Sequence, residues 1–187
     1  MAIGGIEVDI FEKLKSYTDY SVGKTNERME IRYEDSFFEN LIFTGYDLNN
    51  TEFLEVVFSQ CDFTDVYLSG SNLSGSTFKQ CIFKNNIFRK GTAEYTLFDQ
   101  TDIRGIDSFR TSFYKSSFSN LIIEESVMNN CFMADTSFSN VVFSNVDLTG
   151  SRFRRSKFAN VKFIKCVLDK TTFEDASGIE SVEFINN

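Results

Sequence analysis

Residues 38–83 read FENLIFTGYDLNNTEFLEVVFSQCDFTDVYLSGSNLSGSTFKQCIF, and every fifth residue from Phe38 onward is a large apolar side chain. The spacing continues in the same frame to Phe173, which makes twenty-eight pentads, and only the centres Ala93 and Ser108 lack a large apolar side chain. Neither regular element buries every fifth residue, because a strand alternates faces and a straight helix advances about 140° in five residues. The chain must therefore turn a corner in every pentad, which predicts a solenoid.

Side-chain identities also repeat every twenty residues. One column of pentad centres, the core ladder, is entirely phenylalanine: Phe38, Phe58, Phe78, Phe98, Phe118, Phe138 and Phe158. Two residues further on, a column of amides forms the amide ladder: Asn40, Gln60, Gln80, Gln100, Asn120, Asn140 and Asn160. One coil therefore contains four pentads, and the twenty-eight pentads predict about seven coils. Amides stacked at one strand spacing are expected to hydrogen-bond along the rod, so we interpret this ladder as structural.

A second pattern surrounds each centre. Small residues predominate two positions before it, and Asp or Asn often directly precedes it, as in Asp47, Asp62, Asn72, Asp102, Asp107 and Asp147. With two polar residues after the centre, as in SGSNLSG, TDVYLSG and SNVDLTG, this pattern resembles the pentapeptide repeat family over about three quarters of the chain. The resemblance implies an all-β solenoid of the right-handed quadrilateral β-helix type; the handedness comes from the resemblance alone.

The repeat divides the chain into three parts. Residues 1–32 precede it as an N-terminal cap, residues 33–175 form the β-helix, and residues 176–187 form a C-terminal cap or tail. Asp9 and Glu12 resemble a capping box at the start of a short amphipathic helix over about residues 9–20. Its apolar face comprises Ile6, Ile10, Leu14 and Tyr17. In the tail, the residues available to cover the last coil are Ile179, Val182, Phe184 and Ile185.

The coil around Ala93 and Ser108 is the least regular part of the repeat. Ile106 or Phe109 is expected to fill the space that Ser108 leaves. A locally repacked coil is the expected outcome, and a functional kink or projecting corner is the alternative.

The composition argues against catalysis. Histidine is absent, which excludes Ser-His-Asp and Cys-His nucleophiles and imidazole metal sites. The four cysteines, all at the small inward position, are expected to be buried reduced thiols: Cys61, Cys81, Cys131 and Cys166. We find no phosphate-binding glycine motif, signal peptide or membrane-spanning run. The sequence therefore predicts a cytoplasmic protein with no catalytic residue, cofactor or metal.

Outward apolar residues form the candidate protein-contact surface. They directly precede centres in two columns on neighbouring faces. One column contains Ile42, Ile82, Ile122 and Val142, and the other contains Tyr67, Ile87, Val127 and Val167. Branched side chains suit any strand surface, so the columns also have a purely structural interpretation. An apolar stripe across two faces is nevertheless the best candidate for a protein contact.

The net charge of −8 is unevenly distributed. Residues 1–65 hold fourteen acidic and five basic residues, whereas residues 66–175 hold eleven and fourteen. A basic cluster lies near the C-terminal end: Arg152, Arg154, Arg155, Lys157, Lys162 and Lys165. We interpret it as a solvated belt rather than a phosphate-binding patch. The overall acidity disfavours direct binding of nucleic acid.

These observations predict a non-catalytic, rigid β-helical module, monomeric or homodimeric, that presents its surface to another protein. The family resemblance implies an alternative: a DNA mimic that binds the type II topoisomerase gyrase and protects it from inhibitors such as quinolones. The size and total charge of the chain suit that alternative, but the basic middle and C-terminal faces do not. A structural component of a larger assembly is a third possibility.

Overall fold

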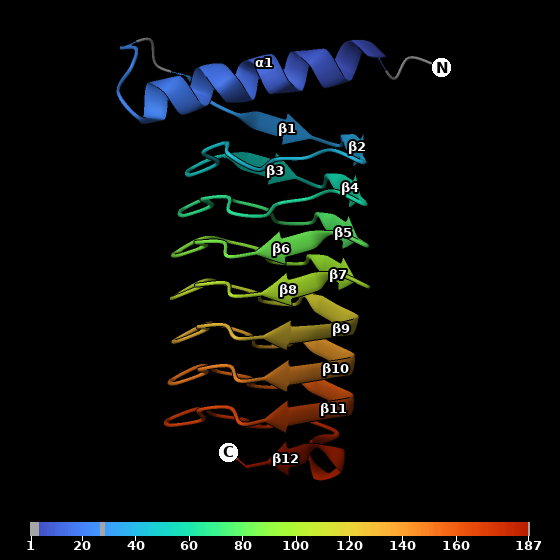
Figure 1. Ribbon diagram of the computed structural model, residues 1–187. Helices are drawn as coiled ribbons and strands as arrows, with labels where there is room; N and C mark the ends of the chain where they lie inside the picture. The colour runs from blue at the N-terminus through green and yellow to red at the C-terminus, as the bar shows by residue number, and fades with distance from the viewer. Residues whose placement is uncertain (1–3, 27–28, 187) are drawn as a thin grey trace.

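The computed structural model describes residues 4–26 and 29–186, and only the backbone of residues 4–9. One helix, α1 (Gly4–Ser21), lies across the end of a rod of stacked coils (Figure 1). The strands are β1 (Arg32–Glu34), β2 (Phe37–Glu39), β3 (Glu52–Leu54), β4 (Val57–Ser59), β5 (Thr77–Lys79), β6 (Ile82–Lys84), β7 (Leu97–Asp99), β8 (Asp102–Arg104), β9 (Ser117–Glu124), β10 (Ser137–Ser144), β11 (Lys157–Ile164) and β12 (Glu183–Ile185). A 3-10 helix, η1 (Ile179–Ser181), precedes β12.

Parallel backbone pairing joins each coil to the next. Phe38 lies opposite Phe58 in the β2–β4 pair, and the same offset of twenty residues recurs as far as the bridge between Lys157 and Ser177. The β11–β12 pair differs, because Lys162 lies opposite Glu183 after η1 has added one residue. The predicted quadrilateral β-helix is confirmed. We name its four faces by their first regular centres: the Phe38, Phe43, Leu48 and Phe53 faces.

The stack is longer than the sequence predicted. Tyr33 stacks on Phe53 with ring centroids 5.8 Å apart, through the β1–β3 pair. At the other end, Phe184 stacks on Phe163 at 5.3 Å, although it lies one residue out of frame. The rod therefore has about 8 turns rather than seven, because an aromatic residue beyond each end of the counted pentads joins the core.

A left-handed residue forms every corner. Every fifth residue from Asp35 to Asp175 has a positive φ, between 48° and 85°. Few of these corners are glycine: Gly45, Gly70, Gly75, Gly105 and Gly150. Asparagine tolerates this conformation better than most residues with a side chain. The amide ladder occupies the corner between the Phe38 and Phe43 faces, so backbone conformation is one reason for its composition.

The centres fill the interior with stacked rings. Along the core ladder, Phe78 lies 4.9 Å from Phe58 and 5.2 Å from Phe98, with nearly parallel planes. Inward hydroxyl groups next to the centres donate across the coils: Ser76 Oγ lies 2.8 Å from the carbonyl oxygen of Phe53, and Thr136 Oγ1 lies 2.7 Å from that of Phe113. Small polar residues can therefore be buried without unpaired donors.

Helix α1 closes the N-terminal end. Ile10 and Leu14 are fully buried, and Phe11 stacks on Tyr46 at 5.7 Å. The helix begins at Gly4, so Asp9 lies inside it and the predicted start near residue 9 is wrong. The side chains of Ile6 and Asp9 lie outside the described residues. No helix in the described part of the chain is long and apolar enough to cross a membrane.

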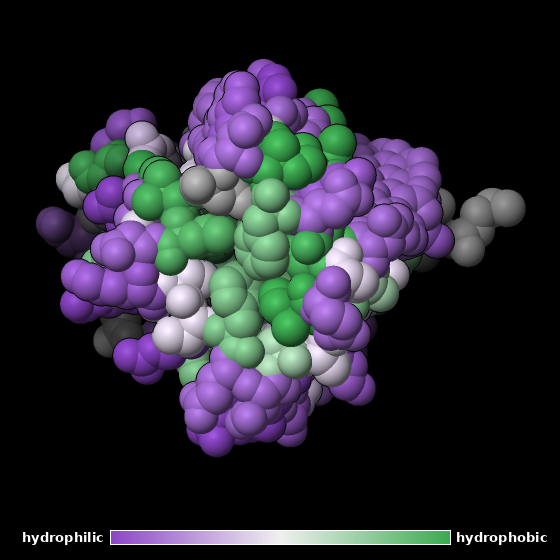
Figure 2. Space-filling model, turned by 90° about the horizontal axis from the view of Figure 1, so that it is seen from below, coloured by the Kyte–Doolittle hydropathy of each residue, from purple (hydrophilic) through white to green (hydrophobic). Residues whose placement is uncertain are grey.

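The C-terminal end is covered less completely. Figure 2 views the rod from this end and shows an apolar centre surrounded by hydrophilic groups. Phe173, Ile179 and Val182 are half-buried there, and Phe184 is 46% exposed. The tail continues the core by one layer, but no further element covers that layer among the described residues.

The coil at Ala93 is repacked by a neighbouring ring. Ala93 is fully buried but small, and Phe88 turns towards this corner, where its ring lies over the backbone of Gly91. A Cβ atom on Gly91 would lie only 2.0 Å from Cε2 of Phe88. The ring of Phe88 also lies edge-on to Phe113 at 6.1 Å. Gly91 is therefore glycine because Phe88 compensates for the small centre.

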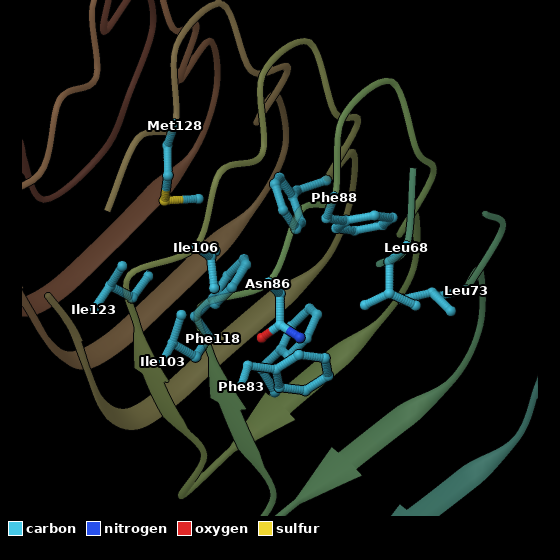
Figure 3. Close-up of a pocket in the computed structure, with 12 residues that line it drawn as sticks. Leu68, Leu73, Phe83, Asn86, Phe88, Ile103, Ile106, Phe118, Ile123 and Met128 are labelled. Carbon is cyan, nitrogen blue, oxygen red and sulfur yellow. The ribbon is translucent and has the colours of Figure 1, made fainter. Parts of the chain in front are cut away.

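The coil at Ser108 keeps a small cavity of about 20 Å³ (Figure 3). Ile106 is buried and lines it, whereas Phe109 is half-buried at the surface, with the Arg110 guanidinium 5.0 Å from its ring centroid. The prediction that Phe109 could fill the space is wrong, because its position after the centre points outward. Asn86 also lines the cavity, and its buried Oδ1 has no hydrogen-bond partner.

Replacing Phe98 by alanine should destabilise the rod strongly. Phe98 is 4% exposed and lies between Phe78 and Phe118, so the variant loses two stacked contacts and leaves a cavity. We expect the free energy of unfolding to fall by about 3–5 kcal/mol in chemical denaturation monitored by circular dichroism. An unchanged midpoint would contradict the described core.

Gly91→Ala tests the repacked coil. The added methyl group must displace the ring of Phe88, and overpacking of this kind typically costs about 1–3 kcal/mol in unfolding experiments. Gly45→Asn is the matched control, because nothing lies within 4 Å of a Cβ atom there and Asn85 occupies an equivalent corner. Equal stability of the two variants would show that Phe88 does not occupy this space.

Candidate protein-interaction surface

The interior offers no room for a substrate. The cavity near Ser108 measures about 20 Å³, and a cavity that holds a single water molecule needs roughly 10–15 Å³. Its lining is apolar except for Asn86, which donates from Nδ2 to the carbonyl oxygen of Val66 at 3.2 Å. Among the described residues, no group of three or more His, Cys, Asp and Glu is placed to hold a metal ion. Outward surfaces are therefore the candidates for function.

An open groove of about 480 Å³ lies between α1 and the first coil. Tyr17, Tyr20 and Ile31 line it together with Arg32 and Glu52. Its charges satisfy one another, because Arg32 contacts both Glu52 and, at 3.2 Å, Glu34. Arg32 is thus engaged by two carboxylates within the described part of the chain, and we assign the groove no ligand.

The sequence-predicted contact residues are outward, but they do not form continuous stripes. On the Phe43 face, Ile42, Ile82 and Ile122 are 62%, 38% and 50% exposed, and Asp62 and Asp102 lie between them. The other predicted residues of the two faces are exposed (Tyr67, Val127 and Val167) or half-buried (Ile87 and Val142). The structure brings together Tyr67 with Ile87, and Ile122 with Val142, on successive coils.

Most of the aspartates that precede centres have a structural role. A carboxylate oxygen of Asp62 accepts a hydrogen bond from the backbone N–H of Thr64 at 2.8 Å, and Asp147 does the same for Thr149 at 3.0 Å. This local bond stabilises the turn after the centre. Because the backbone already occupies one oxygen of such carboxylates, they resemble the free phosphates of a DNA backbone poorly.

The amide ladder is exposed and only partly bonded. Asn160 donates from Nδ2 to Oδ1 of Asn140 at 2.9 Å, and Asn140 donates to Asn120 at the same distance. In the glutamine run, Gln60 donates from Nε2 to Oε1 of Gln80 at 3.4 Å, and Gln80 donates to Gln100 at 3.2 Å. The two runs do not join, because Nδ2 of Asn120 donates instead to Asp99 at 3.0 Å.

The predicted basic cluster is spread over several faces, and three of its six residues, Arg154, Arg155 and Lys162, form ion pairs. Arg155 makes a two-pronged contact with Asp135, at 2.8 and 2.6 Å, and this contact lowers the pKa of the Asp135 carboxyl. Arg154 lies 3.7 Å from Glu174. Arg152 is exposed, and no carboxylate of the described residues lies within ion-pair distance of it.

A cluster that sequence reasoning missed lies on the Phe53 face and its corner. We call it the aromatic–basic patch; it comprises Tyr95, Tyr114, Lys115, Phe132 and Arg152. The ring centroid of Tyr114 lies 6.0 Å from that of Tyr95 and 5.7 Å from that of Phe132. The three rings occupy different positions within their pentads, so only the twenty-residue register could have indicated that they meet.

The cysteines are buried and free, as thiols. Burial raises the pKa of Cys131 to about 11. Cys61 and Cys81 lie on successive coils, and their mutual hydrogen bond raises the pKa of Cys81 and lowers that of Cys61. With exposures of 1–3%, all four act as small core residues.

Comparisons with known proteins agree with this geometry. A family model described as pentapeptide repeats (8 copies) matches residues 61–105, 123–155 and 136–175, and one described as pentapeptide repeats (9 copies) matches residues 38–82. No curated protein sequence matches the chain.

Two solved structures illustrate the likeness. A trypsin-treated variant of QnrB1, a plasmid-mediated fluoroquinolone resistance protein, gives a TM-score of 0.56 at 16% identity, covering 84% of this chain and 89% of that one. HetL, a pentapeptide repeat protein involved in heterocyst differentiation regulation from the cyanobacterium Nostoc sp. strain PCC 7120, gives 0.37 at 12% identity, covering 84% and 91%. At such identities, the QnrB1 likeness concerns the fold alone.

Proposed function

The chain belongs to the pentapeptide repeat family, and from that premise we propose that it is a non-catalytic, rigid module that binds another protein through its outward faces. The observation that carries this proposal is the contrast between a filled core and an outer surface with clustered apolar groups. Tyr95 and Phe132 are 57% and 41% exposed on one face, and Phe184 is 46% exposed at the C-terminal end. Clustered exposed apolar groups mark interaction sites in soluble proteins.

The fold favours binding over chemistry for a physical reason. Ladders of backbone hydrogen bonds fix the position and direction of the backbone at every outward residue. Little conformational entropy is therefore lost when a partner docks. A buried substrate would require a cavity, and inward ring stacking fills that space. The surface is therefore preorganised for recognition.

Protection of gyrase is a second candidate function. It is favoured by the likeness to QnrB1, a fluoroquinolone resistance protein, and by the concentration of acidic residues in the first coils. The arrangement of the acidic residues weakens this candidate. A DNA mimic needs rows of negative charge along the rod, but among the described outward residues the twenty-residue offset places acidic side chains on successive coils only at Asp35 and Glu55. Most of the aspartates that precede centres accept a hydrogen bond from the backbone of the turn that follows them.

Four surface variants test the interaction module. Ile82→Lys with Ile122→Lys alters the Phe43 face, where the new lysines alternate with Asp62 and Asp102. Tyr67→Asp alters the Leu48 face, Phe132→Asp the Phe53 face and Phe184→Asp the C-terminal end. Each should keep its circular dichroism spectrum, and the variants of the three faces should keep a thermal midpoint close to that of the unaltered protein, because their changed side chains point outward. Phe184→Asp also removes the ring that stacks on Phe163, so we expect its midpoint to fall while the rod stays folded. Affinity capture from the source organism with quantitative mass spectrometry should show one protein lost with one variant. Identical captured proteins for all variants would contradict the proposal.

A supercoiling assay with purified gyrase separates the second candidate from the first. A DNA mimic should inhibit supercoiling, or restore it in the presence of a fluoroquinolone, at micromolar protein. Unchanged gyrase activity under both conditions would eliminate this candidate and leave the interaction module in place.

A further inference from the structure

The aromatic–basic patch differs from the other exposed surfaces because its rings form a contiguous group. Tyr114 is half-buried and lies between Tyr95 and Phe132, which are more exposed. Phe132 lies between Ser112 on the preceding coil and Arg152 on the next, since the backbone bridges link all three positions. The three rings therefore form a semi-exposed apolar platform across neighbouring coils.

Two cations flank this platform without ion-pair partners among the described residues. The Lys115 ammonium lies 5.4 Å from the ring centroid of Tyr95 and 5.1 Å from that of Tyr114. Its interaction with Tyr114 raises the pKa of the ammonium group. Arg152 stands on the other side, directly beyond Phe132.

Two carboxylates on neighbouring coils already have hydrogen-bond partners. Asp135 accepts two hydrogen bonds from Arg155, and Oε1 of Glu94 accepts one from the Ser112 hydroxyl at 2.6 Å. Arg155 offsets the charge of Asp135, and neither Lys115 nor Arg152 forms an ion pair among the described residues, so both cations can pair with carboxylates of a partner although the chain as a whole is acidic.

We propose that the aromatic–basic patch binds an acidic polypeptide segment of another protein, whose carboxylates contact Lys115 and Arg152 and whose apolar side chain covers the ring platform. This inference rests on the proposed interaction function and names the chemistry of the partner. Aromatic residues and arginine are enriched at the centres of protein interfaces, where they contribute most of the binding free energy.

The charges favour a polypeptide over a nucleic acid. Proteins that bind single strands combine stacking rings with a groove of many cations along the backbone. Here only two cations flank the rings, too few to follow a backbone that carries one charge per nucleotide, and the net charge of −8 opposes binding more strongly as the number of ligand charges rises. A segment with a few carboxylates around an apolar side chain needs no more than these two.

Fluorescence anisotropy with the full chain tests the proposal. The probe is a fluorescein-labelled oligopeptide of alternating Glu and Leu, compared with a Lys–Leu oligopeptide and with oligo(dT). We expect micromolar binding of the Glu–Leu probe alone, weakening as salt is raised. Tyr95→Asn with Phe132→Thr should raise the Kd about tenfold. Lys115→Gln with Arg152→Gln should raise the Kd and flatten its salt dependence.

The substitutions are chosen to preserve the fold. Asn is common at the corners, where Tyr95 has a positive φ, and Thr92 and Thr172 occupy the column of Phe132. Tyr67→Thr with Lys90→Gln is the matched control on the Leu48 face and should leave the Kd unchanged. Binding equally weakened by control and patch variants would overturn the proposal.

The remaining outcomes are equally informative. Preferential binding of oligo(dT), or of the Lys–Leu probe, would overturn the proposal, as would absence of any binding. Self-association in sedimentation velocity that the patch variants abolish would identify a second copy as the occupant instead. If the Glu–Leu probe fails while capture from the source organism still depends on one face, this inference fails and the interaction module stands.

Discussion

The stacking of each coil on the next at an offset of twenty residues is the constraint on which the rest of the structure depends. Backbone hydrogen bonds between parallel coils impose the spacing, as in the pairing of Phe38 with Phe58. That spacing also suits offset stacking of aromatic rings, so core packing and backbone pairing favour the same register. A slip by one pentad would turn each face onto its neighbour and break the core ladder.

The same constraint explains where the rod is irregular. A centre that is too small cannot be compensated by moving the backbone, because the ladder holds it in place. At Ala93 the ring of Phe88 leans in and requires glycine at position 91, whereas at Ser108 a small cavity remains next to Asn86. Defects are therefore absorbed by side chains, and the outline of the rod continues through them (Figure 1).

On the surface, the register assembles neighbours from distant parts of the chain. Tyr95, Tyr114 and Phe132 lie at three different pentad positions, yet they form one platform. Conversely, the apolar columns that the sequence indicated are interrupted by Asp62 and Asp102, and those of the Leu48 face by Asp107 and Asp147. The register also decides which charged side chains pair. Arg155 forms an ion pair with Asp135 one coil away, whereas Arg152 has no such partner in the described part of the chain.

The five- and twenty-residue periods were sufficient to determine the solenoid, its four faces and the identity of nearly every inward residue, because burial of a centre depends only on its place in the repeat. Tertiary structure decided what the period does not encode. It added Tyr33 to the ring stack, set Phe184 on Phe163 one residue out of frame, extended α1 back to Gly4, and placed Phe109 outside rather than inside. It also decided which outward residues meet, since side chains on a corner or beside a centre reach their neighbours only through the stacking of successive coils. The interior was therefore readable from the sequence, and the arrangement of the binding surface was not.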